Sequence, residues 1–398
     1  MSAGAAARGR ADKRRHDCRR KSEQGASMNI RHVLLASLFG AGTLGALPSV
    51  AGAATPDLEA AKANVEAHSV LPTFTPPGAP FDARKCMAGK KILTIPVSSA
   101  NPFTKNIATA MKAVGKELGF EVTEWENQAR PTQWVQGMEF AINNKYSAID
   151  MLGGVNPAVL GPQIAEAHKA GVEIFTSHLY DTIQKPDPSV DQSMAIPYHK
   201  VGELLADWVT YKTGGKVNAL IVGSDEIVPT PAFVKGITDR LAKVCGPQCR
   251  YTYINAPVPE WSTKIKPSVQ SALIADPTIN YVIPIYDSMS QFVVPAIAIT
   301  GKKNTVKIAT FNGTPFVIDD VQKGTVEMDI GESIGWIARS ILDGYMRKLC
   351  GLKTYDELYV PFYIFDSSNA KNAGSPAGYD RGYGDQHIAG YEKLWMLK

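Results

Sequence analysis

Apolar and polar positions alternate along the middle of the chain in a pattern that predicts strands and helices in turn. Short apolar runs of strand length are each followed by a longer segment with apolar residues at helical spacing. In the first half the predicted strands are 92–97, 120–125, 148–152 and 172–177, and the predicted helices are 102–118, 132–143 and 157–170. The pattern resumes with a helix at 198–211 and strands at 217–222, 251–254, 281–285 and 306–311. Repeated strand–helix units predict an α/β fold with two consecutive lobes, each a parallel sheet covered by helices on both faces.

The two ends of the chain lack this pattern. Residues 54–90 are rich in proline, and residues 366–398 are rich in glycine, serine and tyrosine without periodicity. We interpret them as an extended N-terminal arm and a C-terminal tail, both lying on the surface.

The first 53 residues predict export. Residues 28–53 combine Arg31, an apolar run at 33–47 and the small-residue pattern Ala51-Gly52-Ala53, which is typical of a signal peptide cleaved near Ala53. The apolar run is shorter than the roughly 20 residues that span a bilayer, so a permanent anchor is disfavoured. Residues 1–27 form a basic leader, and because Met28 offers a second start, whether this leader is translated stays open.

The positive net charge of the chain comes from these leader segments. The formal net charge is +4; residues 1–27 contribute +5 and Arg31 contributes +1, which leaves −2 for the remainder. With no basic stripe left after cleavage, the sequence argues against nucleic-acid binding. We find no phosphate loop, dinucleotide glycine pattern or metal cluster, so no cofactor and no metal are predicted.

Four cysteines lie beyond the leader: Cys86, Cys245, Cys249 and Cys350. An exported protein can form disulfides, and we expect Cys245 to pair with Cys249, which leaves Cys86 for Cys350. A metal or redox site is disfavoured because neither histidines nor a C-x-x-C motif accompany them.

One short motif suggests an enzyme. Residues 331–335 read GESIG, which matches the G-x-S-x-G nucleophile elbow, and an extended run precedes it while a helical segment follows. Aspartates and His387 downstream complete a Ser, Asp, His order on paper. A secreted serine hydrolase using Ser333 is therefore the alternative function.

Three longer segments carry a more specific signal. The segments VSSANPFTKNIATAMKAVGKELGFEV, KVGELLADWVTYKTGGKVNALIVG and KIATFNGTPFVIDDVQKGTV resemble type I periplasmic solute-binding proteins of the ribose-binding group, over about residues 91–350. The resemblance implies two doubly wound parallel-sheet lobes joined by a three-strand hinge. It assigns 91–190 and 331–352 to lobe 1, and 191–330 and 353–365 to lobe 2.

The resemblance changes the interpretation of Ser333. It makes 325–330 the third crossover and places Ser333 at the start of the following helix, where serine commonly caps the free N–H groups. The segment after Ser333 is also short for a hydrolase that still needs strands for its acid and histidine. We therefore favour a capping serine and no catalytic residue.

Ligands of open parallel sheets bind beyond the carboxyl ends of the strands, so residues after each strand are the candidates. By the resemblance, Asn101 and Phe103 supply a polar and an aromatic contact from lobe 1, and Trp261 supplies the opposing ring from lobe 2. The two rings are expected to hold a flat ligand between them, with Trp125 nearby.

The other candidate positions depart from the ribose-binding pattern. Ser177 and His178 stand where these proteins carry Asp-Arg, and Phe233 stands where they carry an arginine. The remaining matches are Tyr286 and Asp287 for Asn-Asp, Asn312 for an aspartate, and Asp329 for a glutamine. Each buried unmatched polar group costs about 1–3 kcal/mol, so sugar hydroxyls need paired partners, and this set has lost its guanidinium groups. The retained polar residues still suit a sugar, a polyol or a modified sugar, and the aromatic residues equally suit a ligand with an apolar or aromatic body.

The predicted function is capture of a small molecule in the periplasm and its delivery to an ATP-binding-cassette (ABC) permease by a monomer. A version that feeds a membrane sensor instead of a permease is not distinguished by the sequence.

Overall fold

The structure is a computed structural model in which residues 55–397 are described. The predicted leader at 1–27 and the signal peptide at 28–53 lie outside the described residues.

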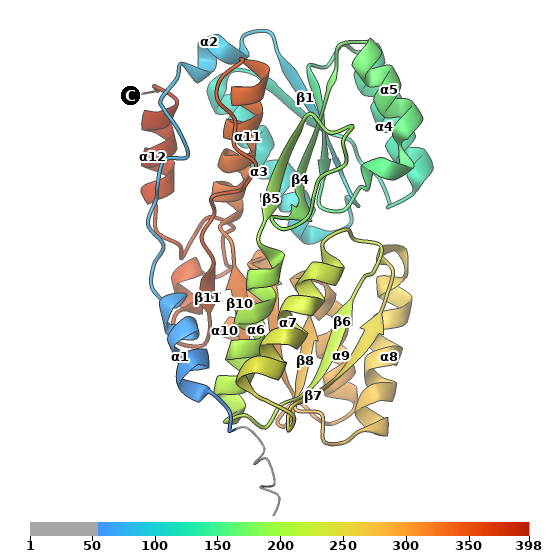
Figure 1. Ribbon diagram of the computed structural model, residues 1–398, viewed down its shortest axis with the longest axis vertical. Helices are drawn as coiled ribbons and strands as arrows, with labels where there is room; N and C mark the ends of the chain where they lie inside the picture. The colour runs from blue at the N-terminus through green and yellow to red at the C-terminus, as the bar shows by residue number, and fades with distance from the viewer. Residues whose placement is uncertain (1–54, 398) are drawn as a thin grey trace, which may run out of the picture. The chain divides into compact units, whose positions relative to one another are not determined.

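The first lobe is built on a parallel sheet of five strands in the order β2-β1-β3-β4-β5 (Figure 1). The strands are β1 Lys91–Pro96, β2 Glu121–Glu124, β3 Ala148–Leu152, β4 Glu173–Asp181 and β5 Gln192–Ile196. Helices α3 Pro102–Leu118 and α11 Ile334–Leu349 pack against each other, as do α4 Pro131–Asn143 and α5 Gly161–Lys169. Successive side chains of a strand point to opposite faces of the sheet. Ile92 of β1 therefore packs in the core with α3, whereas Leu93 packs in the core with α4 on the other face.

The second lobe has a six-stranded sheet in the order β11-β10-β9-β8-β6-β7, in which only β11 is antiparallel. The strands are β6 Asn218–Gly223, β7 Arg250–Asn255, β8 Tyr281–Pro284, β9 Lys307–Asn312, β10 Met328–Gly331 and β11 Tyr363–Phe365. Its helices are α6 Tyr198–Thr213, α7 Thr230–Val244, α8 Trp261–Ala275, α9 Ser290–Ile299 and α10 Pro315–Gln322. Helices α6 and α7 pack together, and α8 packs on α9.

Three passages of the chain connect the lobes, which confirms the predicted fold class. The first runs from β5 into α6, the second from β10 into α11, and the third from α11 back to β11. In the third, Glu357 forms a parallel bridge with Ala195 beside the first passage. The prediction that 325–330 is the third crossover was wrong, because β10 belongs to the sheet of lobe 2 and the passage that follows it is the second in chain order.

Most predicted elements are present, with one divided helix. The helix predicted at 157–170 consists of the 3₁₀ turn η1 Pro157–Val159 and the helix α5. Pro162 lies in the first turn of α5, where its missing N–H is tolerated, whereas in mid-helix it would interrupt the hydrogen bonds.

The arm and the tail differ from the surface extensions that we predicted. The arm contains α1 Leu58–Ala67, which packs on α6, and α2 Ala83–Met87, which packs on α3 and α11. The tail contains the 3₁₀ turn η4 Ala370–Ala373 and the helix α12 Gln386–Leu394, and it buries Tyr383, Tyr391 and Trp395. A few large aromatic side chains, without a repeat in sequence, are enough to fix this segment to the core.

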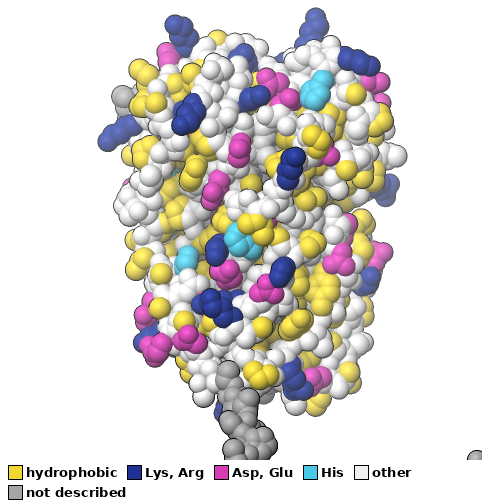
Figure 2. Space-filling view, viewed as in Figure 1, with side chains coloured by type: hydrophobic (Ala, Val, Ile, Leu, Met, Phe, Trp, Pro, Cys, Tyr) yellow, Lys and Arg dark blue, Asp and Glu magenta, His cyan; other side chains and the backbone are white. Residues whose placement is uncertain are grey.

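The two predicted disulfides are present, Cys86–Cys350 and Cys245–Cys249, each with 5.8 Å between Cα atoms. Within residues 55–397 there is no helix whose length and apolar character would let it cross a membrane. On the face shown in Figure 2, acidic and basic side chains are interspersed.

Candidate functional site

A small cavity lies where the carboxyl ends of the two sheets meet, and we call it the inner cavity. Its volume is about 20 Å³, enough for roughly one water molecule. Lobe 1 and the start of α6 contribute Val97, Asn101, Phe103, Thr104, Gly153, His178 and Tyr198; lobe 2 contributes Ile227, Trp261, Tyr286 and Asn312. Six of the ten predicted ligand-binding residues are among them: Asn101, Phe103, His178, Trp261, Tyr286 and Asn312.

A larger cavity of about 510 Å³ opens beside the inner one, and we call it the outer cavity. Lobe 1 lines it with Ser98, Ala100, Asn101, Gln128, Ala129 and Arg130, and lobe 2 with Val258, Pro259, Trp261, Ser262, Gln291 and Phe292. Asn101 and Trp261 line both cavities and therefore form the partition between them. A volume of this size is typical of small-molecule sites.

Asn101 is held in place by its capping of α3. Its Oδ1 accepts hydrogen bonds from the backbone N–H groups of Phe103 at 2.9 Å and Thr104 at 3.3 Å, so only the amide nitrogen is left to face a ligand. The Ser288 hydroxyl of lobe 2 also donates to Oδ1 at 3.4 Å, which is a direct contact between the lobes.

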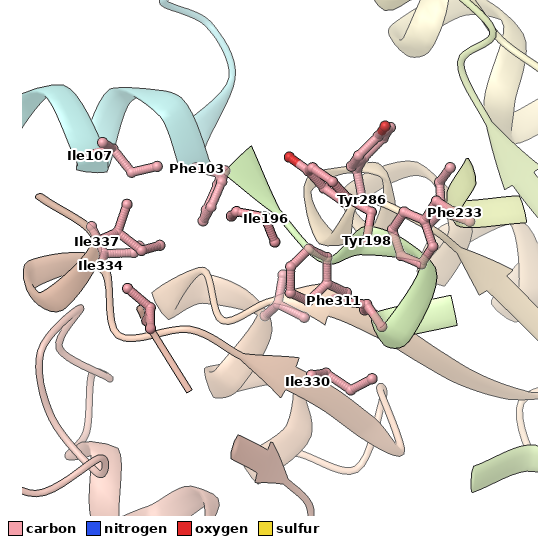
Figure 3. Packing of buried hydrophobic residues seen from close by; sticks show 14 of the residues in the cluster. Phe103, Ile107, Ile196, Tyr198, Phe233, Tyr286, Phe311, Ile330, Ile334 and Ile337 are labelled. Atoms are coloured by element: carbon pink, nitrogen blue, oxygen red, sulfur yellow. The ribbon is translucent and has the colours of Figure 1, made fainter. Parts of the chain in front are cut away.

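The Phe103 ring is fixed at the start of α3 and meets the ring of His178 edge to face, with 4.9 Å between centroids. Figure 3 shows Phe103 near Ile196, across from the aromatic group of Tyr198, Tyr286, Phe233 and Phe311.

His178 lies where the pairing of β4 with β5 shifts register, and its φ of +53° places it in the left-handed region. One ring nitrogen, Nε2, is 2.9 Å from the Glu332 carboxylate, and the other, Nδ1, is 2.6 Å from the Tyr198 hydroxyl. Burial raises the pKa of Glu332, and the neighbouring His178 counteracts this shift. Because both ring nitrogens have partners, His178 offers the cavity its ring rather than a free donor.

Trp261 opens α8, and its indole N–H donates to the Ser224 hydroxyl at 2.8 Å and to the Ala256 carbonyl at 3.0 Å. These bonds fix the ring at the partition between the cavities. Tyr286 is similarly fixed, because its hydroxyl shares a 2.8 Å hydrogen bond with Thr230.

Asn312 closes the inner cavity at the end of β9. Its φ is +150° and that of Gly313 is +76°, so the chain turns sharply after the strand and leaves Asn312 at the cavity wall. A side chain on Gly313 would collide with Tyr383 and with the backbone of Gly331.

Two predicted ligand residues lie behind the cavity wall. The Ser177 hydroxyl donates to buried Asp150 at 2.7 Å. Phe233 is fully buried, and its ring packs against Tyr286 and Phe311 with 6.1 and 5.8 Å between centroids. Neither residue lines the inner or the outer cavity, because each side chain points into the core of its own lobe. Trp125 is also elsewhere, with its indole N–H bonded to the Gln133 carbonyl at 2.7 Å.

The two predicted aspartates of lobe 2 do not reach the cavities either. Asp287 accepts hydrogen bonds from the N–H of Thr314 at 2.6 Å and from its hydroxyl at 2.7 Å, and so holds the start of α10. Asp329 is fully buried, next to the backbone of Asn312 and Gly313. Burial raises the pKa of both carboxyl groups, and their mutual repulsion raises that of Asp329 further.

Ser333 and His387 lie in one cluster, but not in the geometry of a hydrolase. The Ser333 hydroxyl donates to Asp380 Oδ1 at 2.6 Å and accepts from the N–H of Trp336 at 3.2 Å, which makes it the N-cap of α11. His387 Nε2 is 3.0 Å from the same Asp380 oxygen. The carboxylate therefore stands between serine and histidine, whereas a nucleophile needs the histidine beside the serine. Both residues are also buried, so the hydrolase alternative is not supported.

Sequence reasoning missed two groups at the cavities. Tyr198, directly after the first passage between the lobes, lines the inner cavity. Arg130 and Gln291, in or beside first helical turns, line the outer one. Arg130-Pro131 marks a helix start in the sequence and could have drawn attention to Arg130.

The chain has two parallel-sheet lobes joined by three passages, with aromatic and polar side chains enclosed between their strand ends. These features define the class of two-lobed ligand-binding proteins. Residues 92–353 match the family model described as the periplasmic binding protein domain. The chain belongs to this family.

Solved structures share the fold at low sequence identity. The 5-methylthioribose transporter solute-binding protein from Thermotoga lettingae, in complex with 5-methylthioribose, is 18% identical with a TM-score of 0.63, covering 79% of this chain and 100% of its own. A solute-binding protein from Agrobacterium vitis bound to α-D-tagatopyranose is 17% identical with a TM-score of 0.63, covering 71% and 96%. The Caulobacter myo-inositol-binding protein is 16% identical with a TM-score of 0.60, covering 72% and 96%. No curated protein sequence matches the chain significantly.

Proposed function

We propose that this protein is a periplasmic solute-binding protein that captures a small molecule between its lobes and delivers it, as a monomer and without catalysis, to an ABC permease. The observation that carries the proposal is the pair of adjoining cavities between the strand ends of two lobes, in a chain whose family membership is established. Contacts from both lobes would stabilise one arrangement of the hinge, which a permease can recognise.

Sugars and polyols are the first ligand class to consider, because the related structures named above are described with such ligands bound. The rings of Phe103 and Trp261 offer apolar faces, and Asn101 and Asn312 offer amides. Neither cavity contains an aspartate or glutamate in its wall. This combination supports a ligand with an apolar face and few hydroxyls rather than an unmodified hexose, which needs many paired donors and acceptors.

Thermal denaturation of the purified protein against pentoses, hexoses, polyols, methylthio sugars and aromatic acids and alcohols tests the proposal. A ligand at about 100 times its Kd adds about 2.7 kcal/mol to the free energy of unfolding, which raises Tm by several degrees. We expect a shift with one class, and Trp261→Ala to weaken that binding about tenfold or more through loss of ring contact.

The matched control is Trp125→Ala, which removes an indole outside both cavities and should reduce stability but not affinity. Equal affinity of Trp261→Ala and the wild-type protein would reject the cavity between the lobes as the ligand site.

A further inference from the structure

The lining of the outer cavity carries one positive charge and no negative charge. Arg130 is the single charged residue among those that line it. Within residues 55–397 the Arg130 side chain makes neither an ion pair nor a hydrogen bond, whereas Arg240, Arg339 and Arg347 are each paired with a carboxylate.

Three acidic residues that are close to lining residues, in sequence or through a hydrogen bond, are engaged elsewhere. Glu126 pairs with Lys105 at 3.2 Å, and Glu260 pairs with Lys264 at 3.3 Å. Glu226 accepts a hydrogen bond from the N–H of Val258 at 2.5 Å. Among residues 55–397, no carboxylate forms an ion pair with the Arg130 guanidinium in this arrangement of the lobes.

The rest of the lining is neutral and able to bind an organic molecule. Trp261 and Phe292 supply aromatic rings from lobe 2, whereas Gln128, Ser262 and Gln291 supply amides and a hydroxyl. Of these two cavities, the inner one holds about 20 Å³, whereas the outer one, at about 510 Å³, has room for a molecule of sugar size.

We propose that the outer cavity binds the oxyanion group of an anionic ligand, a carboxylate or a phosphate, with Arg130 as its partner and Trp261 against the ligand's apolar face. The inference rests on the proposed function and names the ligand class. A planar guanidinium matches both oxyanions, because it can donate two parallel hydrogen bonds. Arg130 of lobe 1 thus determines specificity for the anionic group, and Trp261 of lobe 2 contacts the rest of the ligand, so the ligand touches both lobes.

The test compares pairs of compounds that differ in charge but share a body. Suitable pairs are galactose with galacturonate, glucose with glucose 6-phosphate, and benzyl alcohol with benzoate, with affinities measured by calorimetry at low and high salt. We expect the anionic member of at least one pair to bind about tenfold tighter, since hydrogen bonds to charged groups are the stronger ones. This preference should weaken at high salt through screening. The uronate and the phosphate ester show which oxyanion is accepted.

Arg130→Gln should weaken binding of the anionic members far more than binding of the neutral members and so abolish the preference, and the Arg130 side chain is exposed, so the fold should tolerate the change. Arg381→Gln is the matched control, since Arg381 is also exposed, makes no ion pair within residues 55–397 and lies outside both cavities.

The possible failures are distinguishable. Neutral compounds that bind as tightly as their anionic partners would overturn the inference and leave the proposed function intact. Equal loss of all ligands in Arg130→Gln would also overturn it, and would indicate that Arg130 pairs with a lobe 2 acid such as Glu226 on closure; Glu226→Gln would then reproduce the effect. A wild-type protein that binds no member of any pair would contradict both the inference and the proposed function.

Discussion

At the scale of single residues, Asp150 shows how a buried charge can serve the fold without serving the ligand site. Its carboxylate accepts hydrogen bonds from Thr94 of β1 at 2.7 Å, Ser177 of β4 at 2.7 Å and Tyr345 of α11 at 2.6 Å. These three hydroxyl groups join two strands of lobe 1 to the helix that returns from lobe 2. Burial outweighs the hydrogen bonds and raises the pKa of Asp150 from 3.8 to about 6.

This shift predicts a pH dependence of stability. Between the two pKa values the folded protein holds a proton on Asp150 that the unfolded chain releases, so the stabilisation is complete below about pH 4 and is lost as pH rises through about 6. A shift of this size corresponds to about 3 kcal/mol. Asp150→Asn cannot titrate and keeps the acceptor oxygen. As pH rises from 4 to 7, the free energy of unfolding of the wild-type protein should therefore fall by about that amount relative to that of the variant. Urea denaturation of both proteins between pH 4 and pH 7 measures the difference, and parallel stability curves would contradict it.

The family resemblance, together with helix-start signals in the local sequence, pointed to part of the candidate site. Asn101, Phe103 and Trp261 stand at helix starts after strands, and local sequence predicts such positions well. Ser177, Phe233, Asp287 and Asp329 lie close to strand ends too, but the direction of a side chain there depends on pleat, register and the contacts of the neighbouring helix. One residue of difference along a strand moves a side chain from the cavity to the core. The ligand-binding role of the six residues at the inner cavity stays a prediction.

At the scale of elements, the turn between β10 and α11 explains the hydrolase-like motif. Gly331 is crowded by Tyr383 and Phe365, and Gly335 is crowded by the Asp380 carboxylate, so neither position has room for a side chain. Ser333 between them caps α11, and Glu332 pairs with His178. The G-x-S-x-G spacing at residues 331–335 thus follows from close packing and helix capping where the chain passes from β10 to α11.

Ser333→Ala should therefore act on stability rather than on chemistry. Loss of an N-cap costs about 1 kcal/mol, and loss of the bond to Asp380 adds to it. Thermal denaturation should show a lower Tm, while hydrolysis of a p-nitrophenyl ester should be equally slow in variant and wild-type protein. Ser271→Ala, at an exposed position of α8, is the control. Ester turnover by the wild-type protein that disappears in Ser333→Ala would contradict the capping role.

The strands and helices of the two lobes could be predicted because their apolar spacing is local and repeated. The arm and tail could not, because their packing depends on isolated residues. Phe74 lies between Trp336 and Tyr391, with centroids 5.8 and 5.0 Å away, and no periodic pattern announces it. Tyr383 reaches Gly331 and Gly313 from 50 or more residues along the chain. Contacts of this kind are visible only when distant segments are brought together.

At the scale of the whole molecule, the arm and the tail add connections to the three passages of the hinge. The arm runs from α1, beside α6, to α2, beside α3 and α11 (Figure 1). On the way, the N–H of Phe81 donates to the Leu394 carbonyl of α12 at 2.9 Å. Both segments lie outside residues 92–353, the part matched by the family model. Cys86 of α2 is then joined to Cys350 at the end of α11.

The two disulfides should contribute unequally to stability. The Cys86–Cys350 bond closes a loop with a sequence separation of 264, whereas Cys245–Cys249 has a separation of 4. By loop-closure entropy the long disulfide loop contributes about 6 kcal/mol to the free energy of unfolding and the short loop about 2 kcal/mol. The double variant Cys86→Ser/Cys350→Ser should therefore have a lower Tm than Cys245→Ser/Cys249→Ser. Equal Tm values for the two double variants would contradict this ranking.

The central claim is that a small molecule binds between the lobes and fixes their relative arrangement. Spin labels at Thr132, in the first turn of α4, and Thr263, in the first turn of α8, report the distance across the outer cavity, with Cys18 replaced by serine. Double electron–electron resonance should give a broad distribution of label-to-label distances without ligand. A ligand that raises Tm should narrow the distribution and shift it to shorter distances. An identical distribution with and without a bound ligand would contradict the claim.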